Sequence, residues 1–131
     1  MKYDVVIVGA GFAGMYLLHK FRNMGLSARV FETASSVGGT WFWNRYPGAR
    51  CDTWSMEYSY KFSEELQQEW QWGELYATQP EIIQYAKHVA DRFDLWKDIQ
   101  FDTTVVSASY NEHSASWIVK TNRGDVCNAA F

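Results

Sequence analysis

The sequence contains few cysteines, no long apolar run and no excess of positive charge. Its two cysteines, Cys51 and Cys127, lie far apart, so neither a disulfide framework nor a zinc site is predicted, and reduced thiols in the cytoplasm are the simplest interpretation. The apolar runs are too short to cross a bilayer, and the opening MKYDVVIVGAG predicts a strand rather than a signal peptide. The formal net charge of −3 gives no reason to expect a nucleic acid or a membrane as a partner.

The chain has instead a large apolar and aromatic content. Of its 131 residues, 47% are hydrophobic and 18% are aromatic, which predicts a packed core rather than disorder. This length suits one domain or a piece of a larger protein, and the sequence contains no internal repeat and no evident linker. Aromatic rings at this density fill a core, but they also flank flat ligands.

The first thirty-two residues predict a strand, a glycine turn, a helix and a second strand. The run Val5–Val8 is short, apolar and β-branched, as in a strand buried on both faces of a parallel sheet. Helical spacing begins at Ala13, Gly25 is placed to end the helix, and a second strand is predicted at Ala28–Glu32. Three residues of the helix are predicted to share its buried face: Leu17, Phe21 and Met24.

The turn between the first strand and the helix has the pattern G-x-G-x-x-G at Gly9–Gly14. In a dinucleotide-binding unit, Gly9 makes the tight turn, Gly11 lets a pyrophosphate approach the backbone, and Gly14 lets helix and strand pack closely. The helix N-terminus offers free N–H groups and a partial positive charge to the phosphates. An ordinary structural turn is the alternative, but the pattern follows a strand, opens a helix and is followed by an acid, Glu32, at the end of the second strand.

Glu32 restricts the nucleotide. A carboxylate at this position accepts hydrogen bonds from both ribose hydroxyls and repels a 2′-phosphate, which favours FAD or NAD over NADP. The alternative is a solvated strand end.

The segment from Thr33 to about Asp52 decides between FAD and NAD. An NAD domain has a short loop and a helix here, whereas this stretch is long and irregular and includes GGTWFWNRYPGARCD. Long irregular segments inside a compact domain are usually functional. The pair Gly38-Gly39 lets the backbone run close to an extended ligand, and Trp41 or Trp43 is expected to flank a flat ring system. We therefore expect FAD.

The rest of the chain predicts a packing helix followed by a meander. Thr78 and Glu81 have the spacing of a capping box, and the helix is expected to run to about Arg92. One face of this helix is expected to carry Ile82, Ala86, Val89 and Phe93. From Thr103 the period becomes two, and TTVVSASY, SWIVKT and DVCNAAF predict three antiparallel strands. Four tryptophans are interpreted as packing residues rather than ligand contacts: Trp70, Trp72, Trp96 and Trp117.

Four features carry a resemblance to a known family: GAGFAG, Glu32, GGTWFWNRYPGARCD and EYSY. Together they resemble the Baeyer–Villiger monooxygenases, which are FAD- and NADPH-dependent flavoproteins, and the likeness is greatest to the phenylacetone, steroid and cyclohexanone monooxygenase branch. The resemblance implies an α/β fold in which a Rossmann-like FAD-binding domain carries an antiparallel β-meander at about 103–131. Such a domain belongs to the flavoproteins that have two dinucleotide-binding domains. Residues 1–131 then form the N-terminal FAD-binding part, and the NADPH domain is absent from this chain because a second G-x-G-x-x-G is absent.

The resemblance implies a reaction and a set of contacts. The parent enzyme is expected to reduce FAD with NADPH, capture O₂ as a C4a-peroxyflavin and convert a ketone to an ester or lactone. Asp52 is expected to orient a catalytic arginine supplied by a later part of the same polypeptide. The expected cofactor-binding residues are Gly9, Gly11, Phe12, Ala13 and Gly14 at the pyrophosphate, Glu32 at the ribose, Val105 at the adenine, Gly38, Gly39, Thr40 and Trp41 along the flavin half, Asp52 and Tyr58 near the isoalloxazine, and Arg50, Cys51 and Asp52 near the nicotinamide of NADP.

Alternatives remain for the site and for the reaction. For Asp52, the alternative role is that of a loop residue whose carboxylate caps backbone N–H groups. A flavin-containing or N-hydroxylating monooxygenase is the rival enzyme class, and a non-catalytic dinucleotide-binding module is the rival of a different kind. Two positions also depart from the family pattern: Trp54 replaces a frequent acid, and Phe42 replaces a frequent tyrosine.

Overall fold

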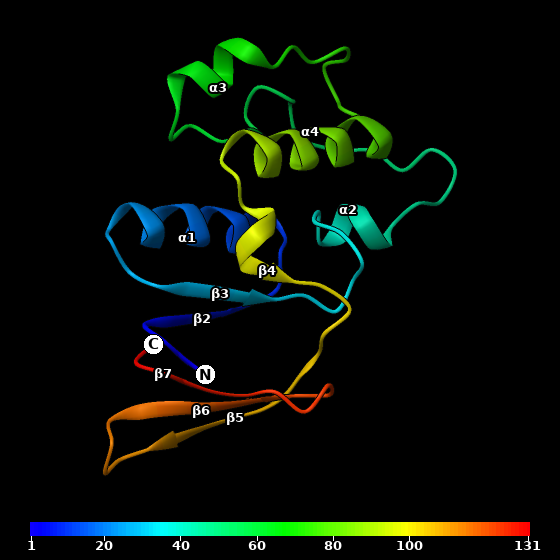
Figure 1. Cartoon of the computed structure of the whole chain (residues 1–131). Coiled ribbons are helices and arrows are strands. Elements are labelled where there is room, and N and C mark those ends of the chain that lie inside the picture. The colour runs from blue at the N-terminus through cyan, green and yellow to red at the C-terminus, as the bar shows by residue number, and fades with distance from the viewer.

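A three-stranded parallel sheet forms the middle layer of the structure, a computed structural model that describes residues 1–131 (Figure 1). Its strands lie in the order β2 (Val5–Val8), β3 (Ala28–Phe31) and β4 (Ile99–Gln100). Val5 pairs with Ala28 in the parallel register, which confirms the predicted pairing of the first two strands. The strand β4 was not predicted, because two residues are too few to form a recognisable pattern.

Helices cover one face of this sheet (Figure 1). The helix α1 (Phe12–Asn23) follows the glycine turn as predicted, but of the three residues predicted to share its apolar face only Phe21 packs against the core. Leu17 is 38% exposed and Met24 is 60% exposed. The residues that α1 buries are Gly14, Met15 and Leu18, because close contact of Gly14 with the turn sets the rotation of the helix against the sheet.

The helix α4 (Gln79–Arg92) lies beside α1 above the same sheet, and its predicted apolar face is buried through Ile82, Ala86 and Val89. The predicted capping box does not form. The Thr78 side chain caps no backbone N–H, and the Glu81 carboxylate accepts a hydrogen bond from Gly73 N–H instead (2.6 Å). None of the helices is long and apolar enough to cross a membrane.

The segment between β3 and α4 contains two short helices. Within the region predicted to be irregular, α2 (Thr40–Trp43) forms one turn after Gly39. Further along, α3 (Glu64–Glu69) has Ser63 as its N-cap, and the Ser63 hydroxyl accepts a hydrogen bond from Leu66 N–H (3.2 Å). The predicted packing role is confirmed for three tryptophans that contact the main core, Trp70, Trp72 and Trp96. A one-turn 3₁₀ helix, η1 (Trp96–Asp98), then leads into β4. Trp117 lies on the meander against Tyr110 and is 38% exposed.

A meander covers the other face of the parallel sheet (Figure 1). Its strands β5 (Val105–Asn111), β6 (Ser116–Thr121) and β7 (Val126–Ala129) pair antiparallel, as predicted. A further strand, β1 (Lys2–Tyr3), pairs with β7. The first strand, predicted from Val5, is therefore preceded by a short strand of the other sheet, and the chain passes between the sheets at Asp4. The Asp4 carboxylate accepts a hydrogen bond from Ser27 N–H (2.7 Å).

Candidate functional site

The glycine turn joins β2 to α1 in a conformation that requires its glycines. Gly9 has a φ of 98°, in the left-handed region that favours glycine. A Cβ on Gly14 would collide with the Gly9 carbonyl oxygen, so the helix can lie this close to the turn only without a side chain there. Both predicted roles, the tight turn at Gly9 and close packing at Gly14, are confirmed.

The N-terminus of α1 presents free backbone donors. The first amide of the helix to bond within the chain is Met15 N–H, which donates to Gly11 O (3.0 Å). The N–H groups of Phe12, Ala13 and Gly14 therefore remain available at the positive end of a twelve-residue helix. This arrangement suits an anion such as a pyrophosphate.

Glu32 lies at the end of β3 and is buried, with 6% of its surface exposed. One carboxylate oxygen accepts a hydrogen bond from Ala10 N–H (2.6 Å) and the other from Ala34 N–H (2.7 Å). The alternative of a solvated strand end is therefore wrong. Because each carboxylate oxygen has two lone pairs, Glu32 retains the capacity to accept further hydrogen bonds from a ligand.

The pair Gly38-Gly39 lies directly against the glycine turn. Gly38 N–H donates to Ala10 O (3.0 Å), and a Cβ on Gly39 would lie 3.0 Å from Gly11 Cα. Both residues have positive φ, 129° for Gly38 and 57° for Gly39. These contacts bring Gly38-Gly39 to the turn Gly9–Gly14, although the two segments are far apart in the sequence. The predicted approach of Gly38-Gly39 to a ligand stays a prediction.

An aromatic wall adjoins the two glycine segments. Trp41 is 8% exposed, and its indole Nε1–H donates to the Tyr58 hydroxyl (2.9 Å). Trp43 is 62% exposed, so of the two tryptophans considered only Trp41 belongs to this wall. The Phe12 ring turns inward and lies 5.5 Å from the Tyr58 ring, centroid to centroid, so Phe12 offers a ligand its backbone rather than its ring.

Two residues that hold this wall were missed in the sequence. The side-chain amide of Gln79, a buried residue of α4, donates to Trp41 O (2.6 Å). The Tyr60 hydroxyl donates to Phe12 O. A glutamine in a first helical turn is common and gives no signal. Tyr60 belongs to the EYSY stretch that contributes to the resemblance, but no role was predicted for it.

Of the residues predicted to lie near the nicotinamide, Arg50 has an exposed side chain and Cys51 has a buried one. Arg50 is exposed, and its Nη1 lies 2.7 Å from Glu74 Oε2 and donates to Tyr76 O (3.2 Å). The Cys51 side chain is 4% exposed and lies in an apolar cluster with Trp41. Neither side chain is brought onto the glycine turn.

Asp52 is exposed in a surface hollow that is also lined by Thr53, Trp54, Glu57 and Tyr76. The adjacent amide, Thr53 N–H, donates to Cys51 Sγ (3.4 Å). Asp52 therefore does not act as the local cap of backbone N–H groups that was considered as an alternative, and its carboxylate faces the solvent.

Val105 begins β5 beside the end of β3. Thr103 N–H donates to Glu32 O (2.9 Å), and the hydroxyls of Thr33 and Thr104 lie 3.1 Å apart. Val105 itself is half-buried and packs beside Phe31. The structure therefore places the segment that leads into Val105 next to Glu32.

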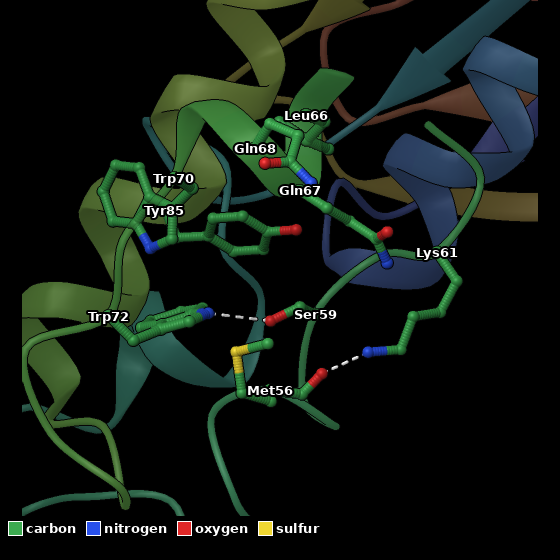
Figure 2. Close-up of a pocket in the computed structure, with 9 residues that line it drawn as sticks. All are labelled: Met56, Ser59, Lys61, Leu66, Gln67, Gln68, Trp70, Trp72 and Tyr85. Atoms are coloured by element: carbon green, nitrogen blue, oxygen red, sulfur yellow. Dashed lines mark hydrogen bonds between the residues drawn. The ribbon is translucent and has the colours of Figure 1, made fainter. Parts of the chain in front are cut away.

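A separate cavity of about 180 Å³ lies between α4, α3 and the segments that precede and follow α3 (Figure 2). Trp72 Nε1–H donates to Ser59 Oγ across it (2.8 Å), and Lys61 Nζ donates to Met56 O at its rim. No residue predicted to bind a cofactor lines this cavity.

These features define the class of the domain. A parallel β–turn–α–β unit with a G-x-G-x-x-G turn, free helix N–H groups and a buried acid at the end of the second strand is a Rossmann-like dinucleotide-binding domain. A family model described as "NAD(P)-binding Rossmann-like domain" matches residues 7–71.

Comparisons with known proteins identify the family. A Baeyer–Villiger monooxygenase from Pseudooceanicola batsensis is 48% identical over 98% of this chain and 24% of its own length. A phenazine N-monooxygenase from Lysobacter antibioticus is 46% identical over the same shares. The solved structure of an oxidized steroid monooxygenase bound to NADP is 62% identical, with a TM-score of 0.98 over 98% of this chain and 25% of that chain. The chain belongs to the Baeyer–Villiger monooxygenase family and spans about a quarter of the length of these relatives.

Proposed function

We propose that this chain is the FAD-binding part of an NADPH- and O₂-dependent Baeyer–Villiger monooxygenase that converts a ketone to an ester or lactone. The observation that carries the proposal is the contact between Gly38-Gly39 and the turn Gly9–Gly14, beside the buried Glu32. This contact forms one continuous backbone surface on which an extended dinucleotide fits. The family relationship supports the reaction type.

The donor set of the site fits FAD. The free N–H groups at the start of α1 suit the pyrophosphate, Glu32 suits the ribose hydroxyls, and the backbone near Val105 suits the adenine. Gly38, Gly39, Thr40, Trp41 and Tyr58 are assigned to the flavin half. When bound, FAD supplies the redox chemistry with NADPH and O₂, while the protein supplies orientation and electrostatics.

Two side chains of this chain are assigned roles beside the flavin half. The Tyr58 oxygen accepts a hydrogen bond from Trp41 Nε1–H (2.9 Å), and the O–H of Tyr58 remains free to donate to a ligand. Asp52 has an exposed carboxylate and no basic partner among the residues that line its hollow, which suits a guanidinium from elsewhere in the longer protein. An arginine held there would stabilise negative charge during oxygen transfer.

A second candidate function is N-oxygenation, which is favoured by the similarity to a phenazine N-monooxygenase. The full-length protein should be given NADPH, O₂, a ketone and a nitrogen heterocycle together, with product analysis by mass spectrometry. Ester or lactone as the main product supports our proposal. N-oxide as the main product supports the second candidate, and bound dinucleotide without NADPH oxidation supports a non-catalytic module.

A further inference from the structure

Tyr60 joins the start of α1 to α4. Its hydroxyl donates a hydrogen bond to Phe12 O, and its backbone N–H donates to the Tyr85 hydroxyl (2.9 Å). The rings of Tyr60 and Phe12 lie 5.4 Å apart, centroid to centroid. Figure 2 shows the Tyr85 hydroxyl directed toward the segment that carries Ser59 and Lys61. Burial raises the pKa of Tyr60 well above its usual range, so the hydroxyl stays protonated and remains a donor.

The carbonyl that Tyr60 contacts belongs to a peptide group with a second role. Phe12 C=O and Ala13 N–H are parts of one planar unit, so a hydrogen bond that fixes the carbonyl also fixes the direction of the N–H. Ala13 N–H is one of the free donors at the N-terminus of α1. A carbonyl that accepts a hydrogen bond also makes the N–H of the same peptide a stronger donor, because linked hydrogen bonds polarise one another.

We propose that Tyr60 is a positioning residue for the pyrophosphate site: its hydroxyl holds the Phe12–Ala13 peptide so that Ala13 N–H faces the bound phosphates. This inference rests on the proposed function, since it requires a dinucleotide at the glycine turn. It assigns to Tyr60 a part in cofactor binding that was not predicted from the sequence. Tyr60 touches no ligand atom in this role and acts only through the backbone.

The test uses Tyr60→Phe in the full-length protein, which removes the hydroxyl and keeps the ring. The matched control is Tyr16→Phe in α1, because Tyr16 is 37% exposed and its hydroxyl makes no hydrogen bond. Dissociation constants are measured by calorimetry on the apoprotein for FAD, ADP and adenosine. We expect Tyr60→Phe to weaken FAD and ADP binding about 3- to 10-fold, the range for one hydrogen bond. We expect adenosine binding to be unchanged, and Tyr16→Phe to match the wild type for all three ligands.

Tyr85→Phe separates the two hydrogen bonds of Tyr60. This variant removes the acceptor of Tyr60 N–H and leaves the bond to Phe12 O, so ADP affinity should stay near that of the wild type. Equal losses for ADP and adenosine in Tyr60→Phe, or an unchanged ADP affinity, would overturn the inference. A wild-type protein that binds no FAD contradicts the proposed function instead. Thermal unfolding of each apoprotein checks that the variants are folded.

Discussion

The carboxylate of Glu32 accepts a hydrogen bond from Ala10 N–H, with 2.6 Å between the oxygen and the nitrogen. Glu32 ends the second strand of the β–α–β unit, and Ala10 lies inside the glycine turn that follows the first. The residue assigned to the ribose therefore also holds the turn assigned to the pyrophosphate. Loss of this carboxylate should disturb both ends of the adenosine diphosphate site, even without a ligand.

Glu32→Gln should destabilise the apoprotein as well as weaken FAD binding. The side-chain amide nitrogen cannot accept a hydrogen bond, so one of the buried amides, Ala10 or Ala34, loses its partner. The free energy of unfolding should fall by about 1.5–3 kcal/mol, as for a hydrogen bond to a charged group. Urea denaturation of the full-length apoprotein measures this, with Glu57→Gln at an exposed position as control. Equal stability of Glu32→Gln and Glu57→Gln contradicts the inference that the Glu32 carboxylate holds the glycine turn in place.

Gly14→Ala should destabilise the protein, although alanine normally favours a helix by about 0.5–1 kcal/mol over glycine. The added Cβ would collide with Gly9 O, and displacement of the helix or the turn should cost about 1–3 kcal/mol. FAD retention through purification should fall with it. The control is Gly73→Ala, where the Cβ would lie 3.5 Å from Glu81 Oε2 in ordinary contact. A thermal midpoint for Gly14→Ala at or above that of the wild type contradicts the packing argument.

Asp52→Ala in the full-length protein should impair oxygenation more than FAD retention. The side chain is exposed and supports no backbone of this chain, so the fold and the flavin content should persist. Loss of one electrostatic group at a reacting centre lowers kcat by about 10²-fold or more. Ester yield per bound flavin measures the effect, and Glu57→Ala in the same hollow is the control. An unchanged ester yield removes Asp52 from the mechanism.

Protonation of the Asp4 carboxylate should make the protein less stable in acid. Hydrogen bonds from Ser27 N–H (2.7 Å) and Ser27 Oγ (2.8 Å) lower the pKa of the Asp4 carboxyl from its ordinary value of 3.8. A lowered folded-state pKa stabilises the fold above the ordinary pKa, and this contribution is lost as pH falls through the folded-state pKa. Asp4→Asn should therefore lower the thermal midpoint at neutral pH and approach the wild type below pH of about 4. Ser27→Ala should reduce the same pH dependence, and parallel pH profiles for wild type and Asp4→Asn contradict this assignment.

The isolated 131-residue chain should lack monooxygenase activity and bind FAD weakly or not at all. Val8 is 67% exposed on β2, and Phe131, which pairs with Val6 through its carbonyl (3.0 Å), is 74% exposed. These residues leave an apolar, incompletely paired sheet edge, which favours aggregation. The chain also contains a single G-x-G-x-x-G, so a separate NADPH site is not expected. An absorbance spectrum with added FAD and an NADPH oxidation assay test this, and a stoichiometric yellow complex that converts a ketone contradicts it.

Local patterns sufficed for the elements that carry the nucleotide site. The β-branched run Val5–Val8, the glycine spacing of Gly9–Gly14 and the apolar stripe of α4 each arise from residues a few positions apart, so their periodicity is visible in the chain. The position of Glu32 relative to the glycines predicted a ligand contact for the same reason. The alternating strands of the meander were also evident in this way.

The tertiary structure alone decided what these elements face. The rotation of α1 follows from the contact between Gly14 and Gly9 O. Glu81 does not take part in the expected capping box and accepts a hydrogen bond from Gly73 N–H instead. The hydrogen bonds of Gln79 to Trp41 and of Tyr60 to Phe12 join segments 38 and 48 positions apart. Such contacts leave no period in the sequence, because their geometry depends on how whole elements pack. The sequence by itself thus determined a dinucleotide-binding unit, whereas long-range packing decided which side chains hold its turn and its aromatic wall in place.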